Sequence, residues 1–336
     1  MGGMATARSC GSAPLTDCYG RTITYLRIAV TDRCNLRCVY CMPEEDASCM
    51  PADALLTNSE LQQLVSVFAA LGVTKVRITG GEPVLRPEIV RFIRSLKEYP
   101  AIRELHLTSN GVDTWKYLDR LKDAGLSGIN FSLDTLDPGR FLRFTRRDAL
   151  SSVLRSIREA VASSLPVRIN AVIQAGKNFD EIIPLAELAR ELPVQVRFLE
   201  QMSFNGLPGT VADPITTEMI FSTLEQEYPD LESFRQESGT ATGYAVPGFS
   251  GSLGIISGHS RTFCSLCDRI RVTPDGLLKT CLYDNGVVSL RDMLRSGAAP
   301  GNLERAIRRA VLGRYENGFI AECSLSGYRT MAAIGG

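Results

Sequence analysis

The chain has 336 residues, of which 44% are hydrophobic and 22% are charged, and its 37 basic residues balance its 37 acidic ones. Length and composition are typical of a globular protein with one large domain and one smaller one. The zero net charge argues against nucleic acid or an anionic membrane as a partner, and no apolar run approaches the roughly 18 residues of a membrane-spanning helix. Residues 1–14 are small and polar without an apolar segment. We therefore expect a disordered tail rather than a secretory signal, and a cytoplasmic protein.

Strand-like runs alternate with amphipathic helices between residues 25 and 199. Thr57 and Glu60 form a capping-box pattern that opens one helix, and Gly72 is its stop signal. Six strand–helix units in succession predict a parallel sheet with right-handed crossovers. The expected strands are 25–30, 75–79, 104–108, 129–134, 167–172 and 194–199. Further helices are expected at 89–96, 115–124, 150–162 and 179–190.

Polar residues alternate with apolar ones along most of these strands, as Arg77 does between Val76 and Ile78. Parallel strands covered by helices are normally apolar on both faces. The alternation therefore indicates a sheet that curves around a polar lumen, unlike a tightly packed eight-stranded barrel core. We predict an α/β fold in which residues 15–200 form an incomplete (βα)6 TIM-like barrel. Its open side leaves room for a large polar ligand.

Residues 201–330 have a different character, because Gly and Pro are frequent and only one longer helix is expected, at 216–228. We predict a small C-terminal α+β module that closes the open side of the barrel. Cys264 and Cys267 lie in this module and are followed by Cys281. The sequence Pro274-Asp275-Gly276 predicts a hairpin turn that carries Cys281 back beside the other two thiols.

Three cysteines, Cys34, Cys38 and Cys41, follow the first expected strand at a C-x3-C-x2-C spacing. Three soft ligands on one short loop can hold three irons of a four-iron cluster and leave the fourth iron open. An iron with an open position is a reaction site. The alternative is a structural zinc site with Cys49 as the fourth ligand. The three-thiol spacing favours the cluster.

The second thiol set leaves the same two alternatives open, because His259 would complete a zinc site with Cys264, Cys267 and Cys281. The chain has ten cysteines, and six fall into these two tight groups, which in a cytosolic protein indicates metal binding rather than disulfides. We expect no role for the remaining four, which are Cys10, Cys18, Cys49 and Cys323.

The first thiol motif, with Tyr40 before its last cysteine, resembles the signature of the radical S-adenosylmethionine enzymes. Two longer strings, Tyr-Gly-Arg-Thr-Ile-Thr-Tyr-Leu-Arg-Ile-Ala-Val-Thr-Asp-Arg-Cys (19–34) and Cys-Met-Pro-Glu-Glu (41–45), are more specific. They resemble the GTP 3′,8-cyclase family of molybdenum cofactor biosynthesis, and the resemblance extends from about residue 15 to the C-terminal end. It implies two 4Fe–4S clusters, one on each thiol set, and S-adenosylmethionine as a cofactor.

The motif Gly80-Gly81-Glu82-Pro83 comes directly after the second expected strand. The two glycines allow close approach of a ligand and exposed N–H groups, and βα barrels keep their active sites at this end of the strands. The resemblance implies that this motif contacts the methionyl amino group of S-adenosylmethionine. The residues implied to bind that cofactor are Tyr40, Gly81, Glu82, Ser132 and Met202.

Several arginines occupy the polar faces of different strands, and Arg269 and Arg271 follow the second thiol pair. Buried arginines need anionic partners, which are either carboxylates such as Glu82, Asp134 and Glu200 or a phosphate-rich ligand. The resemblance implies GTP, bound by Arg27, Arg77, Thr108, Arg168, Arg269, Ile270 and Arg271. Where the family pattern has lysine, this chain has Arg168, which replaces a point charge by a guanidinium fork.

The resemblance also implies the reaction. A 5′-deoxyadenosyl radical removes the ribose 3′ hydrogen of GTP, and the product is (8S)-3′,8-cyclo-7,8-dihydroguanosine 5′-triphosphate, the first intermediate of molybdopterin biosynthesis. The tail 331–336 would reach into the active site, where Gly335 and Gly336 help to place the radical-generating groups. A reductant for the cluster and a downstream cyclic pyranopterin monophosphate synthase are implied partners, and a homodimer is compatible with the sequence.

Two other functions fit parts of the sequence. One is a radical S-adenosylmethionine enzyme with an auxiliary cluster that acts on a peptide, against which the arginine set and the Gly-Gly end argue. The other is a zinc-containing scaffold protein that uses both cysteine groups structurally. A scaffold of this kind would be colourless, whereas clusters make an anaerobic preparation brown.

Overall fold

The computed structural model of this chain describes residues 13–42, 44–45, 48–202, 214–234, 239–324 and 331–335. Most of the tail predicted at 1–14, and Gly336, therefore lie outside the described residues. Within these ranges, no helix combines the length and the apolar character that crossing a membrane requires.

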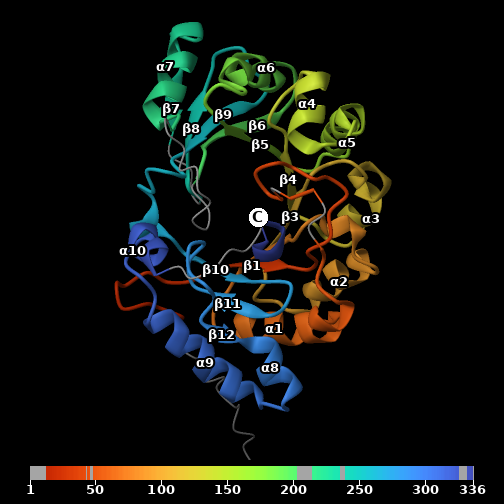
Figure 1. Ribbon diagram of the computed structural model, residues 1–336, viewed down its shortest axis with the longest axis vertical. Coiled ribbons are helices and arrows are strands. Elements are labelled where there is room, and N and C mark those ends of the chain that lie inside the picture. Colours follow the sequence, from red (N-terminus) through yellow and green to blue (C-terminus); the bar gives the residue numbers. More distant parts are fainter. Residues whose placement is uncertain are drawn as a thin grey trace, which may run out of the picture.

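The described strands form one twelve-stranded sheet that curves around a central space (Figure 1). Its middle consists of six parallel strands in sequence order, each hydrogen-bonded to the next. They are β1 (Tyr25–Ala29), β2 (Lys75–Thr79), β3 (Glu104–Ser109), β4 (Gly128–Ser132), β5 (Val167–Ile173) and β6 (Val194–Glu200). The predicted incomplete barrel is confirmed.

Helices cover the outer face of these strands (Figure 1). They are α1 (Asn58–Ala70), α2 (Ile89–Ser95), α3 (Leu118–Asp123), α4 (Pro138–Thr145), α5 (Leu150–Ala162) and α6 (Ile182–Glu191). The capping box of α1 is present, because Thr57 Oγ1 accepts from the Glu60 N–H at 3.2 Å and Glu60 Oε2 accepts from the Thr57 N–H at 2.7 Å. Short 3-10 helices lie at Ala52–Ala54, Pro83–Leu85, Leu96–Glu98, Thr114–Lys116, Phe179–Glu181 and Cys264–Leu266.

The two faces of the strands differ in burial as the sequence alternation predicts. Along β5 and β6, fully buried residues alternate with partly buried ones. Ile169, Val196 and Phe198 belong to the buried set and pack into the same hydrophobic core as Phe68 of α1. The apolar face therefore packs under the helices and leaves the polar face for the lumen.

The C-terminal part extends the same sheet at both edges. Its strands are β7 (Glu232–Phe234), β8 (Ala241–Ala245), β9 (Ser252–Ile256), β10 (Arg269–Val272), β11 (Leu277–Lys279) and β12 (Val288–Ser289). Strand β9 pairs in parallel with β6, and β10 pairs in parallel with β1. Two parallel strands of the C-terminal part therefore flank the six that the sequence predicted. The hairpin predicted at 274–276 joins β10 to β11.

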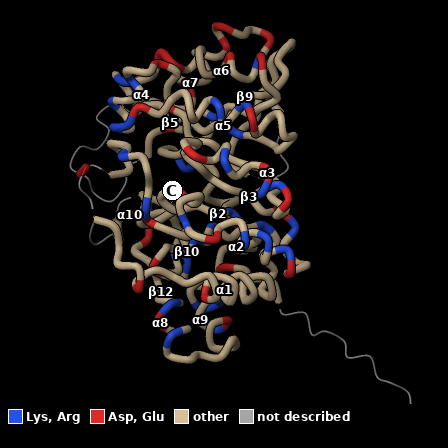
Figure 2. Tube along the Cα trace, turned by 90° about the vertical axis from the view of Figure 1, so that its right-hand side faces the viewer, with Lys and Arg blue, Asp and Glu red and all other residues tan. Residues whose placement is uncertain are grey.

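Five helices complete the described C-terminal part, namely α7 (Thr217–Glu227), α8 (Leu290–Arg295), α9 (Pro300–Leu312), α10 (Gly318–Cys323) and α11 (Met331–Ile334). The C-terminal end lies at the centre of the ring of strands (Figure 1). Consistent with this position, the Met331 N–H donates to the Cys41 carbonyl at 3.3 Å. Basic and acidic segments are interspersed along the outer helices in the view of Figure 2.

Candidate active site

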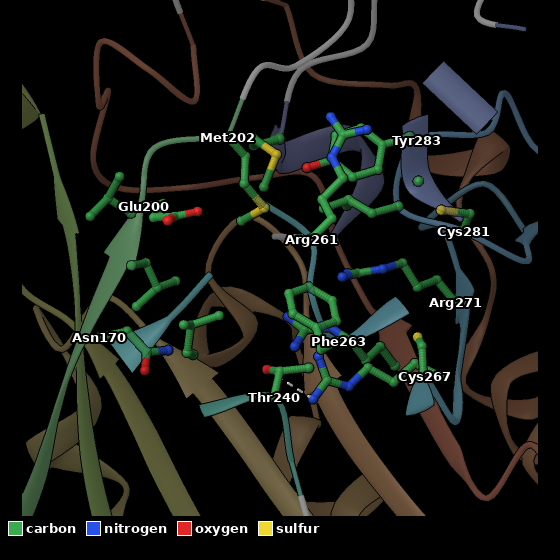
Figure 3. Close-up of a pocket in the computed structure, with 18 of the residues that line it drawn as sticks. Asn170, Glu200, Met202, Thr240, Arg261, Phe263, Cys267, Arg271, Cys281 and Tyr283 are labelled. Atoms are coloured by element: carbon green, nitrogen blue, oxygen red, sulfur yellow. Dashed lines mark hydrogen bonds between the residues drawn. The ribbon is translucent and has the colours of Figure 1, made fainter. Parts of the chain in front are cut away.

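A cavity of about 810 Å³ occupies the lumen and is lined by both the barrel strands and the C-terminal part. In Figure 3, Asn170 borders it from the barrel, while Cys267, Arg271 and Cys281 border it from the C-terminal side. Most of the predicted site residues line this one cavity: Arg27, Tyr40, Cys41, Arg77, Thr108, Ser132, Arg168, Met202, Cys264, Cys267, Arg269, Arg271 and Cys281. Residues that are far apart in the sequence are thus brought together as predicted.

Six other predicted residues are described but do not line the cavity, namely Cys34, Cys38, Gly81, Glu82, Ile270 and Gly335. Ile270 pairs with Leu26 across β10 and β1, and its side chain is 1% exposed in the hydrophobic core. Its side chain is therefore not a cavity contact.

The first thiol set lies on the loop after β1, and α4 holds this loop in place. Two loop amides, those of Arg37 and Val39, each donate to a carbonyl at the end of α4 at 2.9 Å. Burial, followed by the neighbouring Cys41, raises the pKa of Cys38, and burial followed by Cys34 raises that of Cys41. Thiolates crowded into a buried loop are stable together only when metal charge balances them. The loop therefore fits an iron–sulfur cluster.

The Gly80-Gly81-Glu82-Pro83 motif packs against this thiol loop. The Gly81 and Glu82 N–H groups donate to the Thr31 and Arg33 carbonyls, each at 2.7 Å. A Cβ on Gly81 would lie 2.3 Å from the Arg33 carbonyl oxygen, so glycine is required for the close approach of the two backbones. The N–H of Gly81, one of the two glycines expected to expose this group to a ligand, is therefore bonded to the loop instead.

Glu82 is fully buried and connects the end of β3 to the same region. Its carboxylate accepts from the Asn110 N–H at 2.7 Å and from Ser109 Oγ at 2.9 Å, and the Asn110 amide donates to Cys34 Sγ at 3.5 Å. Burial raises the pKa of Glu82 to about 7. In this structure Glu82 therefore helps to position the thiol loop.

The second thiol set lies at the start of β10 and at the end of β11. Arg314 donates to Cys267 Sγ at 2.9 Å. Burial acts to raise the pKa of Cys267, but the charges of Arg314 and Arg269 outweigh it, so the pKa is lowered. Burial raises the pKa of Cys281. One thiol of this set is thus prepared to act as a thiolate ligand.

The zinc alternatives require ligands that converge on one point. Among the residues that the structure describes, no group of three or more His, Cys, Asp or Glu side chains is placed to hold a single metal ion. Zinc would draw its thiolates to about 2.3 Å from one centre, whereas in a four-iron cluster each thiolate binds its own iron.

The polar face of the lumen carries an excess of positive charge. Arg27 of β1 lies opposite Arg77 of β2 on one side and Arg271 of β10 on the other, and like charges opposite each other are unfavourable. Burial alone would raise the pKa of Tyr25, but the charges of Arg77, Arg27 and Arg269 lower it to about 7. Burial, followed by the nearby Arg168, lowers the pKa of Arg197 to about 9.

The carboxylates expected to neutralise these arginines have other partners. Asp134 accepts from Tyr40 Oη at 2.7 Å and from the Val172 N–H at 2.8 Å. Glu200 accepts from the Thr217 and Ser260 main chains and hydroxyls. Glu82 accepts from Ser109, the last residue of β3, and from the Asn110 N–H. The arrangement therefore favours an anionic ligand in the cavity.

Further lining residues were missing from the predicted site. Tyr25, Lys75, Asn130, Asn170 and Arg197 all line the cavity, and Lys75 pairs with Glu104 at 2.7 Å. Each stands on the polar face of a strand. Four of them are in register with a predicted site residue or two positions from one, and Arg197 is in register with Asn170. The period-two alternation could have identified all five.

Two family models match the chain: the Radical SAM superfamily over residues 28–189 and Molybdenum Cofactor Synthesis C over residues 194–320. The GTP 3′,8-cyclase of Moorella thermoacetica is 40% identical over 300 residues, which cover 88% of this chain and 93% of the relative. The chain belongs to the GTP 3′,8-cyclase family. Molybdenum cofactor biosynthesis protein 1 of Bos taurus is 43% identical over 302 residues, which cover 89% of this chain and 48% of that protein. The chain thus spans about half the length of such relatives.

Solved structures share the fold of this family member. Streptococcus suis SuiB bound to S-adenosylmethionine superposes with a TM-score of 0.60 at 14% identity, covering 84% of this chain and 68% of that one. Methylornithine synthase (PylB) superposes with a TM-score of 0.50 at 17% identity, covering 62% of this chain and 63% of that one. As a member of the radical SAM superfamily, the chain uses S-adenosylmethionine and an iron–sulfur cluster, which the first thiol loop fits.

Proposed function

We propose that this chain is a GTP 3′,8-cyclase that converts GTP to (8S)-3′,8-cyclo-7,8-dihydroguanosine 5′-triphosphate in the first step of molybdenum cofactor biosynthesis. The observation that carries the proposal is a single cavity lined by thiols of both sets and by arginines of β1, β2, β5, β6 and β10. Family membership and the name of the Moorella relative support the choice of nucleotide.

The first cluster would be held by Cys34, Cys38 and Cys41. Tyr40, Gly81, Glu82, Ser132 and Met202 would hold S-adenosylmethionine beside it. When bound, the cluster and S-adenosylmethionine would supply the 5′-deoxyadenosyl radical chemistry that the proposed removal of the ribose 3′ hydrogen of GTP requires. The chain itself binds and orients the reactants and excludes water from the lumen.

The arginine-rich face would bind the triphosphate, because guanidinium forks match phosphate oxygens. Its proposed members are Arg27, Arg77, Thr108, Arg168 and the segment Arg269, Ile270 and Arg271, and we add Lys75 and Arg197 because they line the same cavity. Cys264, Cys267 and Cys281 would hold a second 4Fe–4S cluster at the guanine end of the substrate. Gly335 and Gly336 would place the radical-generating groups.

Two partners follow from this chemistry. Forming the radical consumes an electron, so a reductant must supply the first cluster. The cyclised nucleotide requires a further enzyme, for which we propose a cyclic pyranopterin monophosphate synthase.

The proposal is tested first on anaerobically reconstituted protein, by counting iron and sulfide and by identifying the nucleotide product. Two four-iron clusters require about eight irons per chain, and GTP should stimulate the release of 5′-deoxyadenosine. About four irons and no response to GTP would contradict both the second cluster and the substrate.

Single thiol variants then separate the two sets. Cys38→Ser should abolish 5′-deoxyadenosine formation, whereas Cys49→Ser, at an exposed thiol outside both sets, should leave it intact. Normal cleavage by the Cys38 variant would refute the first cluster assignment. Cys281→Ser should retain some uncoupled cleavage and lose cyclisation, so an unchanged yield of cyclised product would remove the second thiol set from the mechanism.

A further inference from the structure

Arg314, which follows α9, contacts Cys267 through two of its N–H groups. One terminal nitrogen donates to the Cys267 carbonyl at 2.8 Å, and the other donates to Cys267 Sγ at 2.9 Å. The arginine is 5% exposed, so water does not screen this contact. The guanidinium fork thus fixes both the main chain and the sulfur of one predicted cluster ligand.

Arg314 is itself oriented by the N-terminal part of the described chain. Asp17 Oδ2 lies 3.8 Å from Arg314 and accepts from Arg21 Nε at 2.6 Å. Arg21 in turn donates to the Cys264 carbonyl at 2.9 Å and to the Tyr315 carbonyl at 2.7 Å. One buried carboxylate therefore connects two buried arginines, and each arginine contacts one cysteine of the second set.

Asp17, Arg21 and Arg314 together carry a net positive charge. Two guanidinium groups share one carboxylate, and all three residues are at most 8% exposed. A buried excess cation is costly unless another group neutralises it. Cys267 can do so as a thiolate, because Arg314 already contacts its sulfur.

We propose that Arg314 is a positioning residue for the second cluster, and that it raises the reduction potential of that cluster through its hydrogen bond to Cys267 Sγ. Hydrogen bonds to cluster sulfurs and nearby positive charge stabilise the more negative, reduced state. Asp17 opposes this effect, because its negative charge lies 3.8 Å from Arg314 Nη1, whereas Nη2 is the nitrogen that donates to the sulfur. The inference rests on the proposed second cluster.

The test uses the full-length chain with Cys34, Cys38 and Cys41 all changed to Ala, so that only the second cluster is loaded. Iron content and the midpoint potential from an EPR-monitored redox titration are measured for Arg314→Gln, Asp17→Asn and Arg309→Gln. Arg309 is an exposed arginine of α9 and serves as the matched control. Arg314→Gln should lower the midpoint, Asp17→Asn should raise it, and Arg309→Gln should leave it unchanged.

A purely structural role for this group would not shift the potential in opposite directions. Equal midpoints for Arg314→Gln and its parent, with full iron content, would overturn the proposal. If Arg314→Gln folds but loses its iron while Arg309→Gln keeps it, the positioning role of Arg314 is supported. The midpoint of Asp17→Asn then tests the effect on the reduction potential, because the proposal requires it to rise. If Arg314→Gln does not fold, the midpoint of Asp17→Asn alone tests the proposal, and an unchanged midpoint would overturn it. If the parent with Cys34, Cys38 and Cys41 changed to Ala binds no iron, the second cluster itself is refuted, and this outcome is distinct from a failure of the role proposed for Arg314.

Discussion

Gly335 accepts a hydrogen bond through its carbonyl from Thr79 Oγ1 at 3.3 Å, so the end of the chain is attached to the C-terminal end of β2 inside the barrel. Arg271, which lines the cavity, donates to the same carbonyl at 3.4 Å. A Cβ at Gly335 would lie 2.5 Å from the Ala29 Cβ and 2.8 Å from Thr79 Oγ1. The tail can therefore occupy this place only with glycine at position 335.

We predict that Gly335→Ala displaces the tail and reduces cyclisation while both clusters remain loaded. Overpacking of this kind costs about 1–3 kcal/mol, which lowers the docked population roughly 5- to 150-fold. Product formation and iron content are the measurements. Gly297→Ala is the matched control, because Gly297 has a φ of +77°, close to the +78° of Gly335, but has no atom within 4 Å of an added Cβ. Equal losses in both variants would show that backbone strain, and not tail docking, is responsible.

The contact between Gly81 and Arg33 leads to a second prediction. An alanine at position 81 would push the thiol loop away, since its Cβ would lie 2.3 Å from one carbonyl oxygen and 2.7 Å from the next. We expect Gly81→Ala to lose iron from the first cluster and to reduce the free energy of unfolding by about 1–3 kcal/mol. Iron analysis and chemical denaturation measure these effects.

The control for this variant is Gly301→Ala in α9, where an added Cβ meets no atom within 4 Å. Alanine favours a helix over glycine, so this variant should be as stable as the parent or slightly more stable. Full iron content in Gly81→Ala would contradict the role assigned to the close approach.

Local signals in the sequence predicted much of this molecule. Period-two alternation located the six central strands and their polar face, and Thr57 with Glu60 placed the start of α1. The helix α4 was missed even though Asp137 and Pro138 form an N-cap and a first-turn proline, which are local start signals.

Long-range relationships were out of reach of such signals. Only tertiary pairing shows that strands β9 and β10 flank β6 and β1. The contact of Asp17 with Arg314 joins opposite ends of the sequence and leaves no periodic pattern. The resemblance of the thiol motif to a known family predicted the cofactors. The hydrogen bonds that Glu82 accepts from Ser109 and Asn110, in contrast, are seen only in the structure.

Arg77 provides a third prediction, in which stability and affinity change in opposite directions. Arg77 is 4% exposed, and its guanidinium donates to Tyr25 Oη in a cation-rich face. Without nucleotide, Arg77→Gln should not lower the thermal stability, because it removes a like charge opposite Arg27. Affinity for GTP should fall roughly 10- to 150-fold, since a charged hydrogen bond contributes about 1.5–3 kcal/mol.

Thermal unfolding with and without GTP, together with a binding titration, measures both effects. Arg94→Gln, an exposed arginine of α2 that does not line the cavity, should change neither. Arg168→Lys should keep most of the affinity, because it preserves a cation for phosphate. Unchanged GTP affinity in Arg77→Gln would remove this arginine from the substrate site.

Tyr25 provides the last prediction, which concerns pH. Burial acts to raise the pKa of Tyr25, but the charges of Arg77 on β2, Arg27 on its own strand and Arg269 on β10 outweigh it and lower the pKa from 10.0 to about 7. Lys75 of β2 also faces the Tyr25 ring. A group with a lowered pKa in the folded state contributes stability that is fully present above the unfolded pKa and is lost as the pH falls through the folded one. The free energy of unfolding of the nucleotide-free protein, relative to Tyr25→Phe, should therefore rise between pH 7 and pH 10.

Tyrosinate absorbance reports the same ionisation directly. The spectrum of the parent minus that of Tyr25→Phe should titrate with a midpoint near pH 7 in metal-free protein. Inorganic triphosphate should move that midpoint upward, because its negative charge offsets the arginines that favour the tyrosinate. Tyr19→Phe, at a side chain that is 51% exposed, should not remove the transition. A midpoint near the ordinary value of 10.0, with or without triphosphate, would show that the cations do not act on Tyr25 as the structure indicates.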